Sequence, residues 1–261
     1  MWKSVPTGRW RSRGSDVLSG LPLSDLLCGV LAYSYVGLVI FAVERLWTGD
    51  RTLGRKILHM SVGNIVFFLW MLTSPWTALV VAGSFILFSL LITSRMQQCF
   101  RDILGRFPEG SGKIYRKALD KLSAISVSGA GNEFGLVYYC IAFTALAILF
   151  YDRPIVVAAG MLPLAFGDGM GAVIGMNYGA HPYAIVDRKS VEGTIVVFAA
   201  AAVGVAFGLI FYGMPLPQAA GMALVIGLVT ALVEAAAPWG LDNLAIPAGA
   251  AGAFLLLGGV A

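Results

Sequence analysis

Charged residues are scarce in this 261-residue sequence. They make up only 12% of the chain, whereas a soluble domain carries about 25%. Hydrophobic residues make up 58%, and the mean hydropathy is +0.82. The shortage of charge argues against a water-soluble protein and predicts an integral membrane protein.

Cysteine is also scarce, and the common catalytic motifs are absent from the sequence. The three cysteines, Cys28, Cys99 and Cys140, have no CxxC spacing, so packing explains them better than a metal site or a disulfide. The sequence has no GxSxG, no HExxH and no dinucleotide-binding glycine fingerprint. Serine-based acyl transfer, zinc-protease chemistry and hydride transfer are therefore not indicated.

What the sequence has instead is a series of long apolar runs. A helix needs about 20 mostly apolar residues to cross the hydrocarbon layer. The runs cover residues 24–47, 57–73, 75–93, 134–151, 154–177, 191–212, 217–236 and 243–260. We expect an all-α, polytopic membrane protein of about eight transmembrane helices, with a basic N-terminal tail at 1–23 and a single membrane domain at 24–261.

Basic residues set the expected orientation. With the N-terminus outside, thirteen lysines and arginines fall on the inside and five on the outside, although the tail itself argues the other way. These basic loops and anionic lipid explain the formal charge of +4, so we expect no nucleic-acid partner. The lack of a long transit segment favours a prokaryotic plasma membrane, with the polar site on its cytoplasmic side.

The longest polar stretch runs from Arg95 to Lys121. Apolar residues recur in it at helical spacing on both sides of a break at Pro108, and basic residues lie between them. This pattern predicts interfacial amphipathic helices between the third and fourth spans. A lid over the site is the alternative.

Most other polar residues lie at helix ends that this orientation places on one side. They are Arg55, Lys56 and His59 at the second run, Asn132 and Glu133 before the fourth, Asp168 in the fifth, Lys189, Ser190 and Glu192 before the sixth, and Glu234, Asp242 and Asn243 around the last turn. Carboxylates facing lysine and arginine suit metal-assisted phosphoryl transfer, because acids hold Mg²⁺ and basic groups neutralise phosphate oxygens.

Asp168 is the sharpest candidate in this set. An acidic residue inside an apolar segment is costly and is a functional hypothesis by default, and the flanking Gly167 and Gly169 let the backbone unwind or approach a ligand closely. Helix packing, with Asp168 paired to a basic neighbour, is the alternative. His59 could accept a proton from a substrate hydroxyl; a structural role or a phosphate contact would also explain it.

The segment from Lys189 to Thr194 has the features of a helix start. Ser190 is a candidate N-cap and Glu192 is favourable in the first turn. Capping does not explain Lys189, because a positive charge is unfavourable there unless an anion binds too. A phosphate at this N-terminus would satisfy both the lysine and the free backbone N–H groups.

Together these segments resemble a membrane family of CTP-dependent lipid-alcohol kinases, which comprises phytol, farnesol and dolichol kinases and the fungal-type diacylglycerol kinase. The matching pieces are Arg55-Lys56-Ile57-Leu58-His59, Glu133-Phe134-Gly135 with Tyr138-Tyr139, Gly167-Asp168-Gly169 with Gly175 and Gly179, Lys189-Ser190-Val191-Glu192-Gly193-Thr194, and Glu234 followed by Asp242-Asn243-Leu244 and Pro247. One departure is Thr194, which stands where serine is commoner.

The resemblance implies that a nucleoside triphosphate, CTP, phosphorylates the hydroxyl of an isoprenoid alcohol in the bilayer. Our hypothesis is that Asp168, His59 and Lys189 are catalytic, and that Asp168 with Glu234 or Asp242 holds Mg²⁺. The nucleotide-binding candidates are Arg55, Lys56, Lys189, Ser190, Glu192, Gly193 and Asn243, and the other motif residues are Asn132, Glu133, Gly167 and Gly169. The sequence indicates neither the particular alcohol nor the oligomeric state.

Other functions stay open at this point. Phosphatidate cytidylyltransferases share the Gly-Asp and Lys-x-x-Glu-Gly elements, but here Trp239, Gly240 and Leu241 precede Asp242 and no histidine follows. Diacylglycerol is an alternative acceptor for a kinase. A transporter is less favoured, because no internal repeat is visible.

Overall fold

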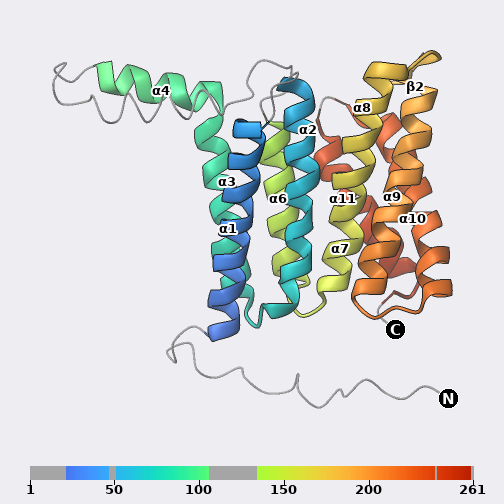
Figure 1. The fold of residues 1–261 in the computed structure, drawn as a ribbon, viewed down its shortest axis with the longest axis horizontal. Coiled ribbons are helices and arrows are strands. Elements are labelled where there is room, and N and C mark those ends of the chain that lie inside the picture. The colour runs from blue at the N-terminus through green and yellow to red at the C-terminus, as the bar shows by residue number, and fades with distance from the viewer. Residues whose placement is uncertain (1–21, 47–50, 106–133, 239, 260–261) are drawn as a thin grey trace.

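The computed structural model describes residues 22–46, 51–105, 134–238 and 240–259. Helices make up most of this part and run side by side as one bundle (Figure 1). In chain order the elements are α1 (Leu23–Leu46), α2 (Arg51–Val62), η2 (Gly63–Met71), α3 (Pro75–Ile92), α4 (Ser94–Gly105), α6 (Gly135–Leu149), α7 (Pro154–Leu162), η3 (Pro163–Asp168), α8 (Gly169–Tyr178), β1 (Pro182–Ala184), β2 (Arg188–Ser190), α9 (Val191–Phe211), α10 (Leu216–Ala236) and α11 (Asp242–Leu256). Residues 1–21 of the predicted tail lie outside the described ranges.

Each of the eight apolar runs of the sequence contains a helix, in agreement with an all-α membrane protein. Within the described ranges, five helices are long and apolar enough to cross a membrane. These are Leu23–Val43, Pro75–Ile92, Pro154–Tyr178, Val191–Phe211 and Leu216–Ala236. Three further apolar helices, Lys56–Met71, Gly135–Leu149 and Asp242–Leu256, are shorter, so eight crossings stay a prediction.

A helix and a small hairpin lie at the edges of the bundle. α4 projects sideways beyond the end of α3 (Figure 1), and it coincides with the first of the amphipathic helices predicted there. The rest of that stretch, residues 106–121, lies outside the described ranges, and the position of α4 at a membrane surface stays a prediction.

A small antiparallel hairpin of β1 and β2, which the sequence did not predict, joins α8 to α9.

The second apolar run changes from an α-helix to a 3₁₀-helix at Gly63. Such a change alters the backbone hydrogen-bonding pattern, and in a membrane each carbonyl left over needs another donor. The Tyr35 hydroxyl donates to the carbonyl of Ser61 at 2.9 Å, and the Tyr212 hydroxyl donates to the carbonyl of Val66. Donors from other helices thus stabilise the irregular stretch.

The fifth apolar run carries Asp168 at the end of a π-helical segment. The segment begins at Pro163, which has no backbone N–H to donate to the preceding turn, and π-helical turns are frequent at functional sites. α7, just before it, is the centre of the bundle, and its residues from Val156 to Leu162 are all buried.

The stretch that follows Asp168 packs closely against α9. A Cβ atom on Gly171 would lie 3.1 Å from the carbonyl oxygen of Gly193, which is tighter than ordinary van der Waals contact. Glycine at this position therefore allows the first turn of α9 to approach α8. This approach brings the hairpin and the start of α9 toward the end of the bundle where Asp168 lies.

A buried carboxylate ties α1 to the start of α3. Asp25, only 1% exposed, accepts hydrogen bonds from the Thr73 backbone N–H at 2.8 Å, the Thr73 hydroxyl at 2.9 Å and the Thr77 hydroxyl at 2.6 Å. Three donors offset the cost of burying this charge. Its role is structural, because all of these contacts join one helix to its neighbour.

Candidate functional site

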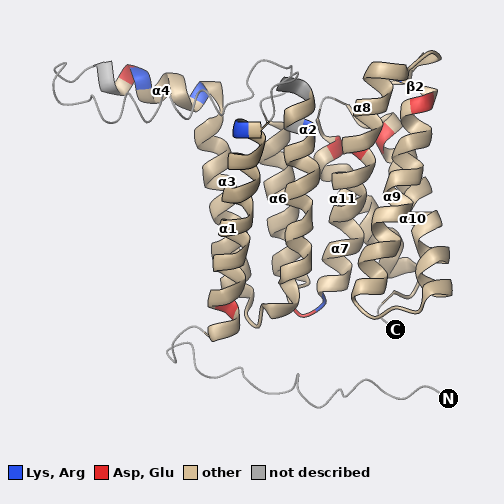
Figure 2. Cartoon of the chain, in the orientation of Figure 1, with Lys and Arg blue, Asp and Glu red and all other residues tan. Residues whose placement is uncertain are grey.

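Among the described residues, the charged ones of the bundle lie mainly at its upper end (Figure 2). There the Lys56 ammonium lies 2.8 Å from Oδ2 of Asp168. Nδ1 of His59 lies 3.6 Å from the same oxygen. Lys56 and His59 are three residues apart on α2, which places them on one helix face, and that face meets the end of η3.

Burial makes the Lys56–Asp168 pair energetically significant. The two side chains are 16% and 9% exposed. A buried ion pair is costly to form, and removing one partner leaves an uncompensated charge. The alternative that Asp168 pairs with a basic neighbour is therefore part of the observed structure, whatever further role the residue has.

A second ion pair lies between the hairpin and α10. The Lys189 ammonium, in the middle of β2, donates to a carboxylate oxygen of Glu234 and also to the Glu234 backbone carbonyl at 2.6 Å. The two side chains are 17% and 10% exposed. The sequence predicted Lys189 and Glu234 as site residues but not that they form a pair.

Asp242 brings a third carboxylate to this region. Its Oδ1 accepts from the backbone N–H of Asn243 at 2.8 Å and from the Asn243 side-chain amide at 3.1 Å. Asp168, Glu234 and Asp242 each interact electrostatically with both Lys56 and Lys189. We call these five residues the charged cluster, which is Lys56, Asp168, Lys189, Glu234 and Asp242.

The start of α9 is capped largely as predicted. Ser190 accepts from the Gly193 N–H at 3.2 Å, and the Val191 N–H donates to the carbonyl of His181 at 3.0 Å. Two N–H groups that a phosphate was expected to satisfy therefore already have partners. Glu192 pairs with His181 at 2.5 Å, so the described contacts of Ser190, Glu192 and Gly193 are structural.

The candidate ligands for a metal ion are the carboxylates of Asp168, Glu234 and Asp242, which lie on three different elements. Among the described residues, no group of three or more His, Cys, Asp or Glu side chains is placed to hold a metal ion. Two buried oxygens, Glu234 Oε2 and Asn243 Oδ1, accept no hydrogen bond within the same ranges. Mg²⁺ often takes one or two carboxylates and completes its shell with water and substrate phosphates. This donor set fits Mg²⁺ that completes its shell with other ligands, and it does not form a cage of protein ligands alone.

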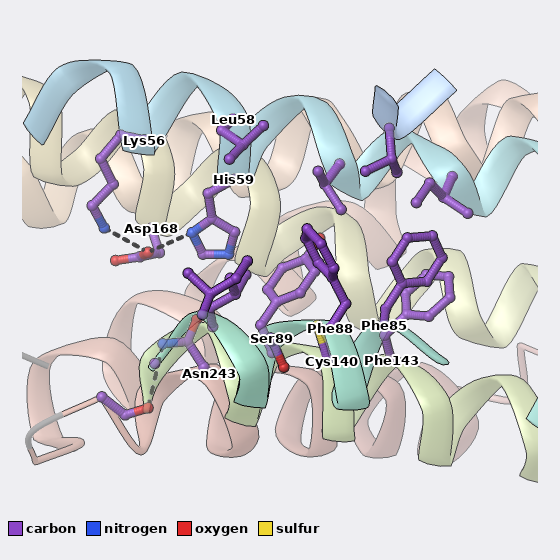
Figure 3. Close-up of a pocket in the computed structure, with 18 of the residues that line it drawn as sticks. Lys56, Leu58, His59, Phe85, Phe88, Ser89, Cys140, Phe143, Asp168 and Asn243 are labelled. Carbon is purple, nitrogen blue, oxygen red and sulfur yellow. Dashed lines mark hydrogen bonds and ion pairs between the residues drawn. The ribbon is translucent and has the colours of Figure 1, made fainter. Parts of the chain in front are cut away.

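A cavity of about 320 Å³ extends from the charged cluster into the bundle. Its walls come from α1, α2, η2, α3 and α6, with Asp168 of η3 and the start of α11. Its polar end includes Lys56, His59, Asp168 and Asp242. Figure 3 shows Lys56, His59 and Asp168 at one end and the rings of Phe85 and Phe143 at the other. The cavity is thus a mostly apolar pocket with its ionisable groups gathered at one end.

The cavity walls are what the sequence analysis missed. Most are apolar residues with no motif of their own. Tyr139 belongs to a segment that was noticed, and its ring packs edge-on against His59 with centroids 4.5 Å apart. Its hydroxyl is buried and has no hydrogen-bond partner among the described residues. A tyrosine inside a candidate motif was the one available signal.

Some predicted residues cannot be placed or lie at the edge of the site. Arg55 is on α2, but the position of its side chain is not described. Asn132 and Glu133 lie outside the described ranges. Gly167 faces α9, and Gly169 leaves room for Met60 of α2, so that both glycines serve the close packing around Asp168.

Comparison with known proteins gives two relatives along most of the chain. A protein from Synechocystis sp. named phytol kinase is 28% identical over 240 residues, covering 87% of this chain and 92% of the relative. A protein from Arabidopsis thaliana named farnesol kinase, chloroplastic, is 26% identical over 228 residues, covering 82% of this chain and 69% of the relative. No protein-family model matches the chain, and no solved structure matches it. The two relatives confirm the resemblance to lipid-alcohol kinases that the motifs indicated.

Proposed function

We propose that this chain is a membrane-embedded kinase that transfers a phosphoryl group from a nucleoside triphosphate to the hydroxyl of an isoprenoid alcohol. The observation that carries the proposal is the cavity, because its apolar length ends at the Lys56–Asp168 pair and His59. An alcohol with a long hydrocarbon tail has the same division into an apolar body and a polar head. The names of the two relatives support the same acceptor class.

The acceptor would lie with its tail between α1, η2, α3 and α6 and its hydroxyl at His59. Asp168 is 3.6 Å from Nδ1 of His59, which suits a carboxylate that orients an imidazole and favours its protonated form. Nε2 would then take the proton of the hydroxyl as its oxygen attacks. Tyr139, whose ring contacts His59, helps to fix the imidazole plane.

The donor would approach from the water side of the charged cluster. Lys56 and Lys189 supply the positive charge that phosphate oxygens need, and Arg55 lies one residue before Lys56 on α2. Both lysines are held by carboxylates, so phosphate binding exchanges one anionic partner for another. Mg²⁺, held by Asp168 with Glu234 or Asp242, would neutralise charge on the β- and γ-phosphates.

The transfer balances without any further reactant. A bond forms between the alcohol oxygen and the γ-phosphorus, and the bond from that phosphorus to the bridging oxygen breaks. The nucleoside diphosphate leaves, and the proton of the alcohol goes to His59. CTP as the donor follows from the resemblance alone, and the cytoplasmic side follows from the distribution of basic residues.

The test is phosphorylation by membranes or purified protein supplied with CTP labelled at either the α- or the γ-phosphate. A kinase moves only the γ label into lipid and releases CDP, whereas a cytidylyltransferase moves the α label and releases pyrophosphate. The acceptors are isoprenoid alcohols, diacylglycerol and phosphatidate in parallel. Transfer of the α label into lipid would refute the proposal. So would the absence of any label transfer with every acceptor and every nucleoside triphosphate tried.

Asp168→Asn is the matched variant for this test. It keeps the shape of the side chain and removes its charge, so we expect loss of transfer in a protein that still inserts into membranes. Asp152→Asn is the control, because Asp152 is half-exposed and its ion pair among the described residues is with its neighbour Arg153. Normal transfer by the Asp168 variant would remove that residue from the mechanism.

A further inference from the structure

A second, smaller apolar cavity adjoins the apolar end of the first. Its volume is about 10 Å³. Four residues line both cavities: Ile65, Ala82, Phe85 and Phe143. The other walls of the small cavity come from α1, η2, α3 and α6, which also line the large one, and from Leu72 directly after η2.

The two cavities follow one another along the same helices. On α3 the large cavity is lined from Ile92 down to Ala82, a rise of about 15 Å at 1.5 Å per residue. The small cavity continues on α3 from Phe85 to Ala78, about one turn farther. The four shared residues therefore form a partition across one longer apolar path.

The partition is made mainly by two aromatic rings. Phe143 is 7% exposed. The ring of Phe85 packs against that of Tyr33, with centroids 5.3 Å apart. In Figure 3 both phenylalanines lie away from Lys56 and Asp168, at the apolar end of the pocket. Neither ring has a polar atom, so both rings act on a bound chain only by the space that they occupy.

We propose that Phe85 and Phe143, together with Ile65 and Ala82, form the floor of the acceptor pocket and limit the length of the isoprenoid chain it accepts. The inference rests on the proposed function, since it takes the hydroxyl to be fixed at His59. A chain measured from that fixed head reaches the floor with its terminal carbons. A chain longer by one isoprene unit fits only if these four side chains move apart or the hydroxyl moves away from His59.

The test compares chain-length profiles in two variants of opposite effect. Phe143→Ala joins the cavities, so kcat/KM for the longer alcohols should rise about tenfold relative to the shorter ones, in a series of two to five isoprene units. Ala82→Leu fills the same partition from the other side and should shift the profile toward shorter alcohols by a similar factor. Phe143→Leu is a milder replacement that keeps more of the core filled.

Phe67→Ala is the matched control. Phe67 lies on η2, and its ring packs against Phe207 and Phe211 at 5.5 and 4.9 Å; it lines neither cavity. This variant should leave the chain-length profile unchanged. An unchanged profile in both partition variants, or an equal shift in the control, would overturn the inference.

A binding measurement separates this inference from the proposed function. Protein in detergent is titrated with the same alcohols, and thermal stabilisation is recorded without any nucleotide. A length-dependent stabilisation that Phe143→Ala extends and Ala82→Leu shortens supports the floor even where no phosphoryl transfer occurs. Transfer by the wild-type protein with no length dependence in either assay refutes the floor and leaves the proposed function intact.

Discussion

The charges of Lys56 and Asp168 should be strongly coupled in the folded protein, and a double-mutant cycle measures that coupling. The cycle uses Lys56→Met, Asp168→Asn and the double variant. Each single change leaves one buried charge without its partner, whereas the double change removes both charges. The coupling between the two sites is the difference between the double variant and the sum of the singles.

The magnitude follows from the geometry of the pair. At 2.8 Å and an effective dielectric constant of 20, two unit charges attract by about 6 kcal/mol. Desolvation of side chains that are 16% and 9% exposed offsets part of this attraction. We expect Asp168→Asn to lower the free energy of unfolding by about 3–5 kcal/mol. Lys56→Met should cost less, because His59 still lies beside the carboxylate.

The assay is equilibrium unfolding in mixed micelles, followed by tryptophan fluorescence. The double variant should be more stable than the sum of the singles predicts, with a coupling of about 2–3 kcal/mol. The same cycle at Asp152 and Arg153, which are 50% and 54% exposed and 3.9 Å apart, is the control. Solvent screening should keep the coupling of that pair below about 0.5 kcal/mol.

Two results would contradict this reasoning. Additive single changes at Lys56 and Asp168 would mean that the two charges do not meet in the folded protein. A coupling no larger than that of the exposed control pair would mean that water reaches the site freely. Either result would remove the basis for treating this end of the cavity as a desolvated reaction site.

Two further predictions concern other parts of the bundle. Lys189→Gln should raise KM for the nucleotide by about tenfold or more, because one charged hydrogen bond to a phosphate is lost, and should leave KM for the alcohol nearly unchanged in steady-state kinetics. Equal changes in both constants would count against a phosphate contact. Tyr212→Phe should lower the free energy of unfolding by about 1–3 kcal/mol, since the Val66 carbonyl loses its donor; Tyr178→Phe, at an exposed position, should have no measurable effect.

The extent of the helices could be predicted from the sequence because the membrane sets their length. The first run was expected at residues 24–47 and forms α1 at Leu23–Leu46. The 3₁₀ and π-helical segments could not be predicted in the same way. The 3₁₀ segment that begins at Gly63 accepts a hydrogen bond at Val66 from the Tyr212 hydroxyl, which is 146 residues away along the chain. Local sequence does not show such a partner.

The charged residues of the site were predictable for a related reason. Ionisable groups are costly in hydrocarbon, so those found in apolar helices gather at helix ends or inside the protein. That rule identified Lys56, Asp168 and Glu234 but could not assign their partners. The pairing of Lys189 with Glu234 joins residues 45 apart, and the contact of Glu192 with His181 depends on the unpredicted hairpin. The cavity could not be predicted from the sequence, because the apolar residues of its walls resemble ordinary core residues.

The location of the charged cluster suits the joining of two reactants that dissolve in different phases. A nucleoside triphosphate carries several charges, and charged groups do not enter the hydrocarbon layer without large cost. The isoprenoid tail has the opposite preference, because each buried CH₂ is stabilised by about 0.8 kcal/mol relative to water. The reacting hydroxyl must therefore lie at the boundary between the phases. Lys56, His59 and Asp168 mark such a boundary, since they close the polar end of a cavity whose opposite end is entirely apolar.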